Sequence, residues 1–179
     1  PNFRLPFGIT AYLLQDRHAL NWKATAMQLQ TAPKDATVKH TISDMRVLLV
    51  EDTAPMADLI VAMLTSMGVH LVRTASNGEI ALQEFRDNPE DFDIIVSDWV
   101  MPKMTGLELL KEIRALDATI PFLMLTVRTA NDAVMDAVDA NVTAYITKPF
   151  KARNFHAKMS AMFEHVLAKK SASNAFIDL

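Results

Sequence analysis

Five short apolar runs, separated by segments of helical character, constrain this chain more than any other feature. Each run has four or five residues, the length and composition typical of buried parallel strands. Strands that alternate with helices favour a parallel sheet covered by helices on both faces. We therefore predict an α/β fold whose strands cover Arg46–Val50, Val69–Arg73, Asp93–Ser97, Phe122–Leu125 and Thr143–Ile146.

Five helices are predicted after these strands. Pro55 suits the first turn of the first helix and Gly68 its C-terminal stop. The next are expected over residues 79–86, 105–116, 130–140 and 151–169, and the last should turn Phe155, Met159, Met162, Phe163 and Val166 inward. The sequence alone leaves the strand order open. A flavodoxin-like, doubly wound order of 2-1-3-4-5 is the common solution for a small sheet, and we expect it here.

Composition excludes several classes of protein. The net charge of −3 and the lack of a Lys/Arg cluster argue against nucleic-acid binding. The chain has no cysteine, and its five histidines show no ligand spacing, so we expect neither disulfides nor a zinc site. No apolar run of about 18 residues is present, so no membrane insertion is expected. The absence of cysteine fits a cytoplasmic location.

Polar side chains follow four of the apolar runs. Glu51 and Asp52 come after the first, Asp98 after the third, Thr126 after the fourth and Lys148 after the fifth. In a parallel sheet these ends share one edge, and the order 2-1-3-4-5 puts the first and third strands at the switch point where such folds bind ligands. A single aspartate after a strand is more often a cap or a turn residue. Because polar side chains from four separate segments converge on one edge of the sheet, we favour a functional site over four unrelated caps or turns.

The residue types at this edge suit phosphoryl chemistry. Three carboxylates repel one another unless a cation joins them, and Mg²⁺ prefers oxygen ligands of this kind. A lysine adds positive charge and a threonine adds a hydroxyl donor. Phosphoryl transfer depends mostly on positioning and charge neutralisation, and a carboxylate can serve as the nucleophile. We therefore predict a magnesium site at which an aspartate becomes phosphorylated.

The same residues resemble the response regulator receiver family of two-component signalling. The resemblance covers residues 46–169, and its motifs are closest to those of the stand-alone chemotaxis regulators. The matching strings are Val47-Leu48-Leu49-Val50-Glu51-Asp52, Ser97-Asp98-Trp99-Val100-Met101-Pro102-Lys103-Met104-Thr105-Gly106, Thr126, and Tyr145-Ile146-Thr147-Lys148-Pro149-Phe150.

The resemblance implies a role for each acidic residue. Asp98 would accept a phosphoryl group from a histidine kinase or a phosphotransfer protein. Asp52, Asp98 and the backbone carbonyl of Val100 would ligate Mg²⁺ directly, and Glu51 would act through a metal-bound water.

It also implies a switch. Lys148 would pair with the phosphate, Thr126 would move to hydrogen-bond it, and Tyr145 would rotate between exposed and buried states. The Lys148–Pro149 bond is expected to be cis. A downstream protein would then bind the face formed by residues 130–169. The motifs resembling those of chemotaxis regulators favour a role in chemotaxis or motility.

A few positions depart from the family pattern. Val127 stands where a small residue is usual, and Asn141 where glycine is common; asparagine tolerates positive φ well. Val100 and Arg128 occupy the places that tune hydrolysis of the phosphoryl group. Neither side chain can orient an attacking water as a base, so we expect a long phosphorylated lifetime. Trp99 is expected to be a half-buried loop residue.

Three regions are expected: residues 1–44 as a helical N-terminal extension and linker, 45–170 as the receiver, and 171–179 as a tail too short for an output domain. Within 9–30 an apolar stripe could bury itself on the receiver, on a second copy in a homodimer, or on a missing upstream region. A weakly ordered leader, or a natural start at Met45, is the other interpretation. The stripe comprises Tyr12, Leu13, Ala19, Leu20, Ala26 and Met27.

Three classes of function remain to be compared. We favour a response regulator without an output domain, which catalyses only its own phosphoryl transfer and dephosphorylation. A magnesium-dependent phosphatase of the haloacid dehalogenase type should carry a second aspartate two places after the nucleophile, where Val100 stands. A phosphorylation-independent binding module should lack the acceptor, an acidic metal ligand or the lysine, and all of these are present.

Overall fold

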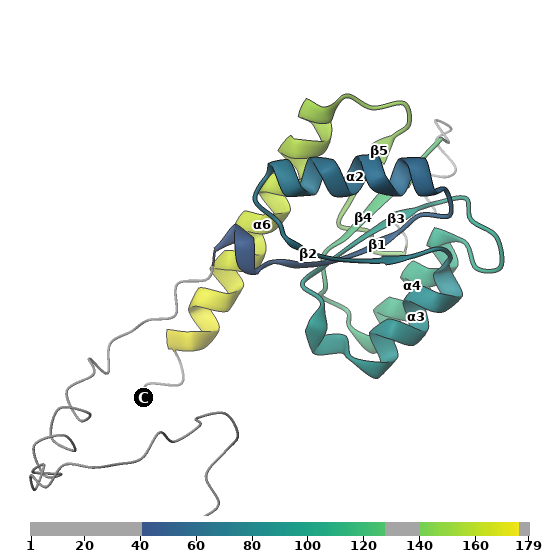
Figure 1. Cartoon of the computed structure of the whole chain (residues 1–179). Helices are drawn as coiled ribbons and strands as arrows, with labels where there is room; N and C mark the ends of the chain where they lie inside the picture. Colours follow the sequence, from purple (N-terminus) through teal and green to yellow (C-terminus); the bar gives the residue numbers. More distant parts are fainter. Residues whose placement is uncertain (1–40, 128–139, 176–179) are drawn as a thin grey trace, which may run out of the picture. The chain divides into compact units, whose positions relative to one another are not determined.

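A five-stranded parallel sheet forms the centre of the protein (Figure 1). The structure is a computed structural model and describes residues 41–127 and 140–175. The strand order is β2-β1-β3-β4-β5, so the predicted flavodoxin-like fold and its order are confirmed. The strands are β1 (Arg46–Val50), β2 (Leu71–Ala75), β3 (Ile94–Asp98), β4 (Phe122–Thr126) and β5 (Ala144–Thr147).

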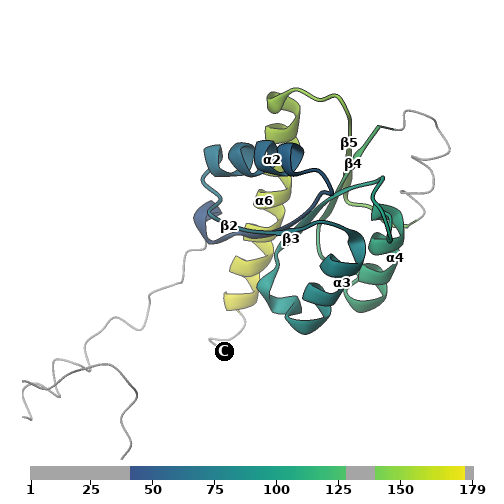
Figure 2. The same ribbon diagram turned by 45° about the vertical axis from the view of Figure 1, so that its right-hand side comes forward.

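Helices cover both faces of the sheet, as Figure 2 shows. Helices α2 (Ala54–Ser66) and α6 (Ala152–Ala175) pack on one face, and α3 (Gly78–Asp87) and α4 (Gly106–Leu116) pack on the other. Two short 3₁₀ turns, Ile42–Asp44 and Pro89–Asp91, precede β1 and β3. The helices predicted over residues 9–30 and 130–140 lie outside the described residues, apart from residue 140 itself.

The second strand starts two residues later than predicted. Val69 is apolar and fully buried, which made it resemble the first residue of a strand. Its N–H instead bonds the carbonyl of Leu64 at 3.1 Å, so Val69 belongs to the turn that ends α2. Gly68 makes this turn possible, because its φ of +92° lies in the region that favours glycine. The predicted stop of the first helix is therefore confirmed.

Side-chain caps fix the starts of α3 and α4. The Asn77 side chain accepts a hydrogen bond from the N–H of Ile80 at 3.1 Å. Thr105 and Glu108 form a reciprocal capping box at the start of α4. Before β5, Asn141 has a φ of +60°, as expected for an asparagine at that place. The two caps fix the points at which α3 and α4 begin, and the turn at Asn141 leads the chain back into the sheet.

The last helix is longer than predicted. It runs to Ala175 rather than ending at Lys169, and its five predicted inward residues are all buried. Two lysines attach its later turns to the sheet end that lies opposite the carboxyl ends of the strands. Lys169 Nζ donates to Thr119 Oγ1, and Lys170 Nζ lies near Asp93 Oδ1, both at 2.9 Å. These contacts depend on the tertiary structure, so helical periodicity did not indicate them.

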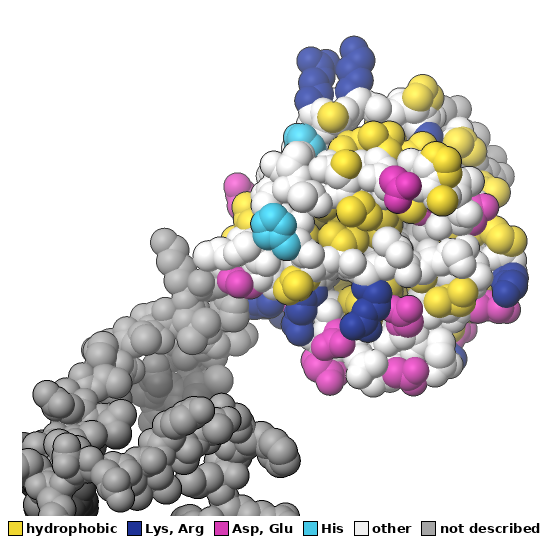
Figure 3. All heavy atoms as spheres, in the orientation of Figure 1, with side chains coloured by type: hydrophobic (Ala, Val, Ile, Leu, Met, Phe, Trp, Pro, Cys, Tyr) yellow, Lys and Arg dark blue, Asp and Glu magenta, His cyan; other side chains and the backbone are white. Residues whose placement is uncertain are grey.

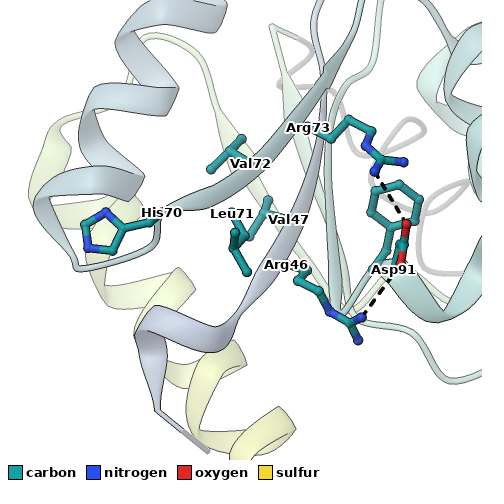
Figure 4. A pocket seen from close by; sticks show the side chains of 8 residues that line it. Arg46, Val47, His70, Leu71, Val72, Arg73 and Asp91 are labelled. Carbon is teal, nitrogen blue, oxygen red and sulfur yellow. Dashed lines mark hydrogen bonds and ion pairs between the residues drawn. The ribbon is translucent and has the colours of Figure 1, made fainter. Parts of the chain in front are cut away.

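Ion pairs link the first two strands at the same end. Arg46 and Arg73 both reach Asp91, at 4.0 and 3.4 Å, and the Arg73 guanidinium lies over the ring of Phe92 (Figure 4). The pocket formed there contains both arginines and Asp91. Because its cations are paired with a carboxylate, we assign this pocket a structural role.

Asp93 is the most enclosed member of this ion-pair group. Its side chain is 6% exposed, and it receives hydrogen bonds from the Arg46 backbone at 3.0 Å and from the Arg46 guanidinium at 3.3 Å. Burial alone would raise the pKa of Asp93. The hydrogen bonds from Arg46 and Lys170 outweigh burial and hold this pKa below its usual value. Asp93 therefore stabilises the fold above its unfolded pKa, and this contribution is lost as the pH falls through the lower, folded value.

Replacing Asp93 by Asn should lower the free energy of unfolding by about 2 kcal/mol at neutral pH, because two cations lose a buried partner. Urea denaturation should show this difference shrinking as the pH falls through the folded pKa of Asp93, because the carboxylate of the parent protein then becomes protonated as well. The matched control is Asp91→Asn, an exposed pair that should cost less than about 1 kcal/mol. A difference for Asp93→Asn that stays constant across this pH range would contradict the assignment.

Helix α2 presents an apolar outer surface. Its sequence contains one charged residue, Asp58, and Leu59 is exposed. Figure 3 shows hydrophobic side chains gathered over this helix. In the part of the chain that the structure describes, no helix is both long and apolar enough to cross a membrane.

Candidate functional site

The predicted site residues lie at the carboxyl ends of neighbouring strands. Glu51 and Asp52 directly follow β1, and Asp98 is the last residue of β3. Thr126 ends β4, and Lys148 follows β5. The strand register pairs Val50 with Ser97 and Asp98 with Leu125, so these ends lie level on the right-hand side of the sheet in Figure 1.

Three carboxylates meet at this edge. Glu51, Asp52 and Asp98 each offer one oxygen, and these oxygens lie within 4.8 Å of one another. The side chain of Glu51 is only 1% exposed, Asp98 is largely buried and Asp52 is exposed. Two carboxylates are thus held in a poorly solvated place, where their mutual repulsion is strong unless a cation offsets it.

Lys148 supplies such a cation. Its Nζ lies 2.9 Å from Glu51 Oε2 and 2.9 Å from Asp98 Oδ2, so it bridges the two buried carboxylates. Burial alone would lower the pKa of Lys148. Its hydrogen bonds to Asp98 and Glu51, together with their negative charges, outweigh burial and hold the pKa of the ammonium above its usual value. Lys148 therefore stays charged at neutral pH.

The backbone around Asp98 is tightly constrained. The N–H of Trp99 donates to Asp98 Oδ1 at 2.7 Å, and the Ser97 hydroxyl donates to the Asp98 carbonyl at 2.8 Å. The N–H of Gly106 donates to the carbonyl of Trp99 at 2.9 Å, which brings the start of α4 against the end of β3. Both carboxylate oxygens of Asp98 thus have a donor, one from the backbone and one from Lys148.

Thr53 is a member of the site that sequence reasoning missed. Its hydroxyl donates to Glu51 Oε1 at 2.6 Å, and its backbone N–H donates to the same oxygen at 3.3 Å. The signal that could have found it is its place directly after the two acids and before a proline. From sequence alone, that segment indicates only the start of a helix.

The residues of the predicted switch are placed as follows. Thr126 is buried, and its carbonyl accepts a hydrogen bond from the N–H of Lys148 at 2.6 Å. Tyr145 lies on β5 and is exposed. The Lys148–Pro149 bond is cis, as expected. The ends of β4 and β5 are thus joined directly at the site.

Two exposed valines are close in sequence to site residues: Val100 is two residues after Asp98, and Val127 directly follows Thr126. Val100 is 55% exposed and Val127 is 60% exposed. Arg128 lies outside the described residues. The prediction of a half-buried Trp99 is wrong, since this residue is 6% exposed and belongs to the core cluster on the α3 and α4 face. The chain turns inward after Asp98, and this turn places the indole in the core.

The donor set fits a hard dication. Carboxylate oxygens close together, one of them exposed to solvent, are the ligands that Mg²⁺ uses when it also retains waters. Lys148 adds a second positive charge next to Asp98. An anionic group that approached Asp98 would therefore meet positive charge from both sources, which is the arrangement that phosphoryl transfer requires.

Known proteins are similar to this chain in both sequence and fold. The family model of the response regulator receiver domain matches residues 47–160. Chemotaxis protein CheY-3 of Vibrio cholerae is 34% identical over 125 residues, which cover 69% of this chain and 95% of that protein. Chemotaxis protein CheY of Pseudomonas aeruginosa is 35% identical over 124 residues, which cover 68% of this chain and 98% of that protein.

Solved structures share the fold. Chemotaxis protein CheY4 of Vibrio cholerae superimposes with a TM-score of 0.61 at 29% identity, covering 66% of this chain and 98% of that chain. A CheX–CheY complex with BeF3 and Mg²⁺ from Borrelia burgdorferi gives 0.63 at 25% identity, covering 66% of this chain and 89% of the matched chain.

Proposed function

The chain belongs to the response regulator receiver family, and from this membership we propose that it is a signalling switch that accepts a phosphoryl group on Asp98. One observation carries the proposal. Lys148 bridges Asp98 and the buried Glu51 at 2.9 Å, next to the exposed Asp52. This combination gives a nucleophilic carboxylate, a fixed positive charge and a place for a metal ion within one cluster.

We assign each residue of the site a separate role in phosphoryl transfer. Asp52 and Asp98 would hold Mg²⁺ with the Val100 carbonyl, and Glu51 would act through a water. When bound, Mg²⁺ supplies positive charge that offsets the charge of the transferring group. A carboxylate oxygen of Asp98 forms the new O–P bond as the N–P bond of a phosphohistidine donor breaks. Lys148 then pairs with the phosphoryl oxygens, since it already lies beside Asp98.

The switch follows from the position of Thr126. We propose that its hydroxyl bonds the phosphoryl group and that this shift favours a buried state of Tyr145, which is exposed in the structure. Such a change is a population shift between existing states. The face formed by residues 130–169 would then change its affinity for a downstream protein, with part of that face outside the described residues.

The same site should hold its phosphoryl group for a long time. Val100 and Arg128 cannot orient a water for in-line attack on the phosphorus. Val127 is exposed next to Thr126, and we expect its branched side chain to restrict the approach of water further. The double variant Val100→Asn, Arg128→Glu should therefore lose phosphate faster than the parent protein, in a decay measured by intact mass. Val100→Asn alone separates the two contributions. Equal decay rates would show that these side chains do not set the lifetime.

The proposed function is tested with a small phosphodonor. We expect that acetyl phosphate and Mg²⁺ add one phosphoryl group to the protein, seen by intact mass, and that chelation of the metal prevents the addition. Turnover of phosphate esters without an adduct would indicate a phosphatase instead. No reaction at all would indicate a binding module.

The relatives suggest the pathway. Two curated relatives are chemotaxis proteins, and a related CheY was solved in complex with CheX. We propose that this protein serves chemotaxis or motility, receiving its phosphoryl group from a histidine kinase or a phosphotransfer protein. Pull-downs from the source cell with phosphorylated and unphosphorylated protein should recover different partners.

A further inference from the structure

Thr53 occupies the position of a helix cap without acting as one. It is the N-cap residue of α2, where a threonine normally accepts a hydrogen bond from the N–H two or three residues later. The structure shows no such side-chain bond between Thr53 and α2. The residue two places later is Pro55, which has no N–H to offer. The hydroxyl therefore remains available to a partner outside the helix.

The hydroxyl instead donates to the site. Thr53 Oγ1 lies 2.6 Å from Glu51 Oε1, a short distance typical of an O–H donor bonded to a carboxylate. Together with the Thr53 N–H at 3.3 Å, it gives this oxygen two donors from one residue. The other oxygen, Oε2, pairs with Lys148 at 2.9 Å. Each oxygen of a carboxylate that is 1% exposed thus has its own partner.

These two partners differ in what phosphorylation would do to them. Lys148 is shared with Asp98, so a phosphoryl group on Asp98 would draw it away from Glu51. Among the described residues, Thr53 donates to Glu51 and not to Asp98. Glu51 Oε2 and Asp98 Oδ2 share the ammonium group of Lys148, each at 2.9 Å, so Oε2 is the Glu51 oxygen on the side of the acceptor carboxylate. If Lys148 turned toward a phosphoryl group, Thr53 would still hold Oε1, and Oε2 would be available to the metal site.

We propose that Thr53 is a positioning residue that fixes the orientation of Glu51, so that Glu51 Oε2 is presented to the metal site. The inference rests on the proposed function, because it assigns Thr53 a role in the same magnesium site. It goes further by separating the roles of the two Glu51 oxygens: Thr53 anchors one, and the other serves the metal.

Calorimetric titration of the full chain with Mg²⁺ alone tests this role. Thr53→Val removes the hydroxyl and keeps the size, so its dissociation constant for Mg²⁺ should rise about three- to tenfold, the effect of losing one typical hydrogen bond. Thr53→Ser keeps the hydroxyl and should stay within about twofold of the parent protein. At saturating Mg²⁺, the rate of phosphorylation by acetyl phosphate should change less than the affinity does.

Three further variants control the titration. Thr65→Val makes the same substitution at an exposed position of α2 and should bind Mg²⁺ as the parent does. Asp52→Ala removes a proposed direct ligand and should weaken binding far more. Thr53→Ala provides a second hydroxyl-free variant if Thr53→Val does not fold.

Two results would overturn the role of Thr53. The first is that the hydroxyl-free variants bind Mg²⁺ as tightly as the parent protein does. The other is a Thr53→Ser variant that is weakened as much as Thr53→Val, since the hydroxyl would then be irrelevant. A parent protein that neither binds Mg²⁺ nor becomes phosphorylated would overturn the proposed function itself, and the two failures are therefore distinguishable.

Discussion

Replacing Asp98 by Asn is expected to abolish phosphorylation and to leave the fold intact. The amide has nearly the same size, so it can still accept the hydrogen bond from the Trp99 N–H that Asp98 Oδ1 accepts at 2.7 Å. It lacks the negative charge that makes the carboxylate a nucleophile. Lys148 would keep Glu51 as its partner, at 2.9 Å, so the cation would not be stranded.

The measurement is intact mass after incubation with acetyl phosphate and Mg²⁺, with a circular dichroism spectrum to verify folding. Asp87→Asn makes the same chemical change at an exposed position near the end of α3 and should be phosphorylated like the parent protein. If Asp98→Asn gains a phosphoryl group at the parent rate, another residue is the acceptor.

Gly106→Ala should destabilise the protein by about 3 kcal/mol or more, because the added methyl group meets backbone rather than a flexible side chain. A Cβ at this position would lie 2.1 Å from the carbonyl oxygen of Asp98 and 2.9 Å from the sulfur of Met124. Relief of that clash requires the start of α4 to move away from the end of β3. The hydrogen bond from the Gly106 N–H to Trp99 would be lost with it.

Gly68→Ala is the matched comparison. Among the described residues, a Cβ there would meet Ile42 alone, at 4.0 Å, but the φ of +92° disfavours a side chain. Its expected cost is about 1–2 kcal/mol, the strain of the left-handed region alone. Urea denaturation should therefore rank Gly106→Ala well below Gly68→Ala in stability. Equal costs would mean that the contact with Asp98 is easily relieved.

The sheet was largely predictable because its strands are buried on both faces. Every residue of β3 and β4 is buried, so each produced an uninterrupted apolar run in the sequence. The edge strand β2 was harder, since Arg73 and Thr74 are exposed and polar while Val69, outside the strand, is buried. An apolar pattern indicates which residues are buried, not which residues form a strand. At β2 the buried residues and the strand residues are different sets.

The charged groups of the site were predictable from their places after the strands, but their contacts were not. Asp98, Glu51 and Lys148 could be named because parallel topology brings strand ends together. Thr53 could not, because its role depends on which way a hydroxyl points. The burial of Trp99 and the extra turns of α6 depend on packing between segments far apart in the sequence, and a single-sequence pattern carries no signal for either.

The charged residues of the site are synthesised in a fixed order. Glu51 and Asp98 are made before Lys148, which follows the last strand of the sheet, and 50 positions separate Asp98 from Lys148. At about 5–20 residues per second, a ribosome needs several seconds to cross that interval. A nascent chain therefore carries the acceptor and its acidic neighbours for that time without their lysine, and the counter-charge is added only when translation reaches Lys148.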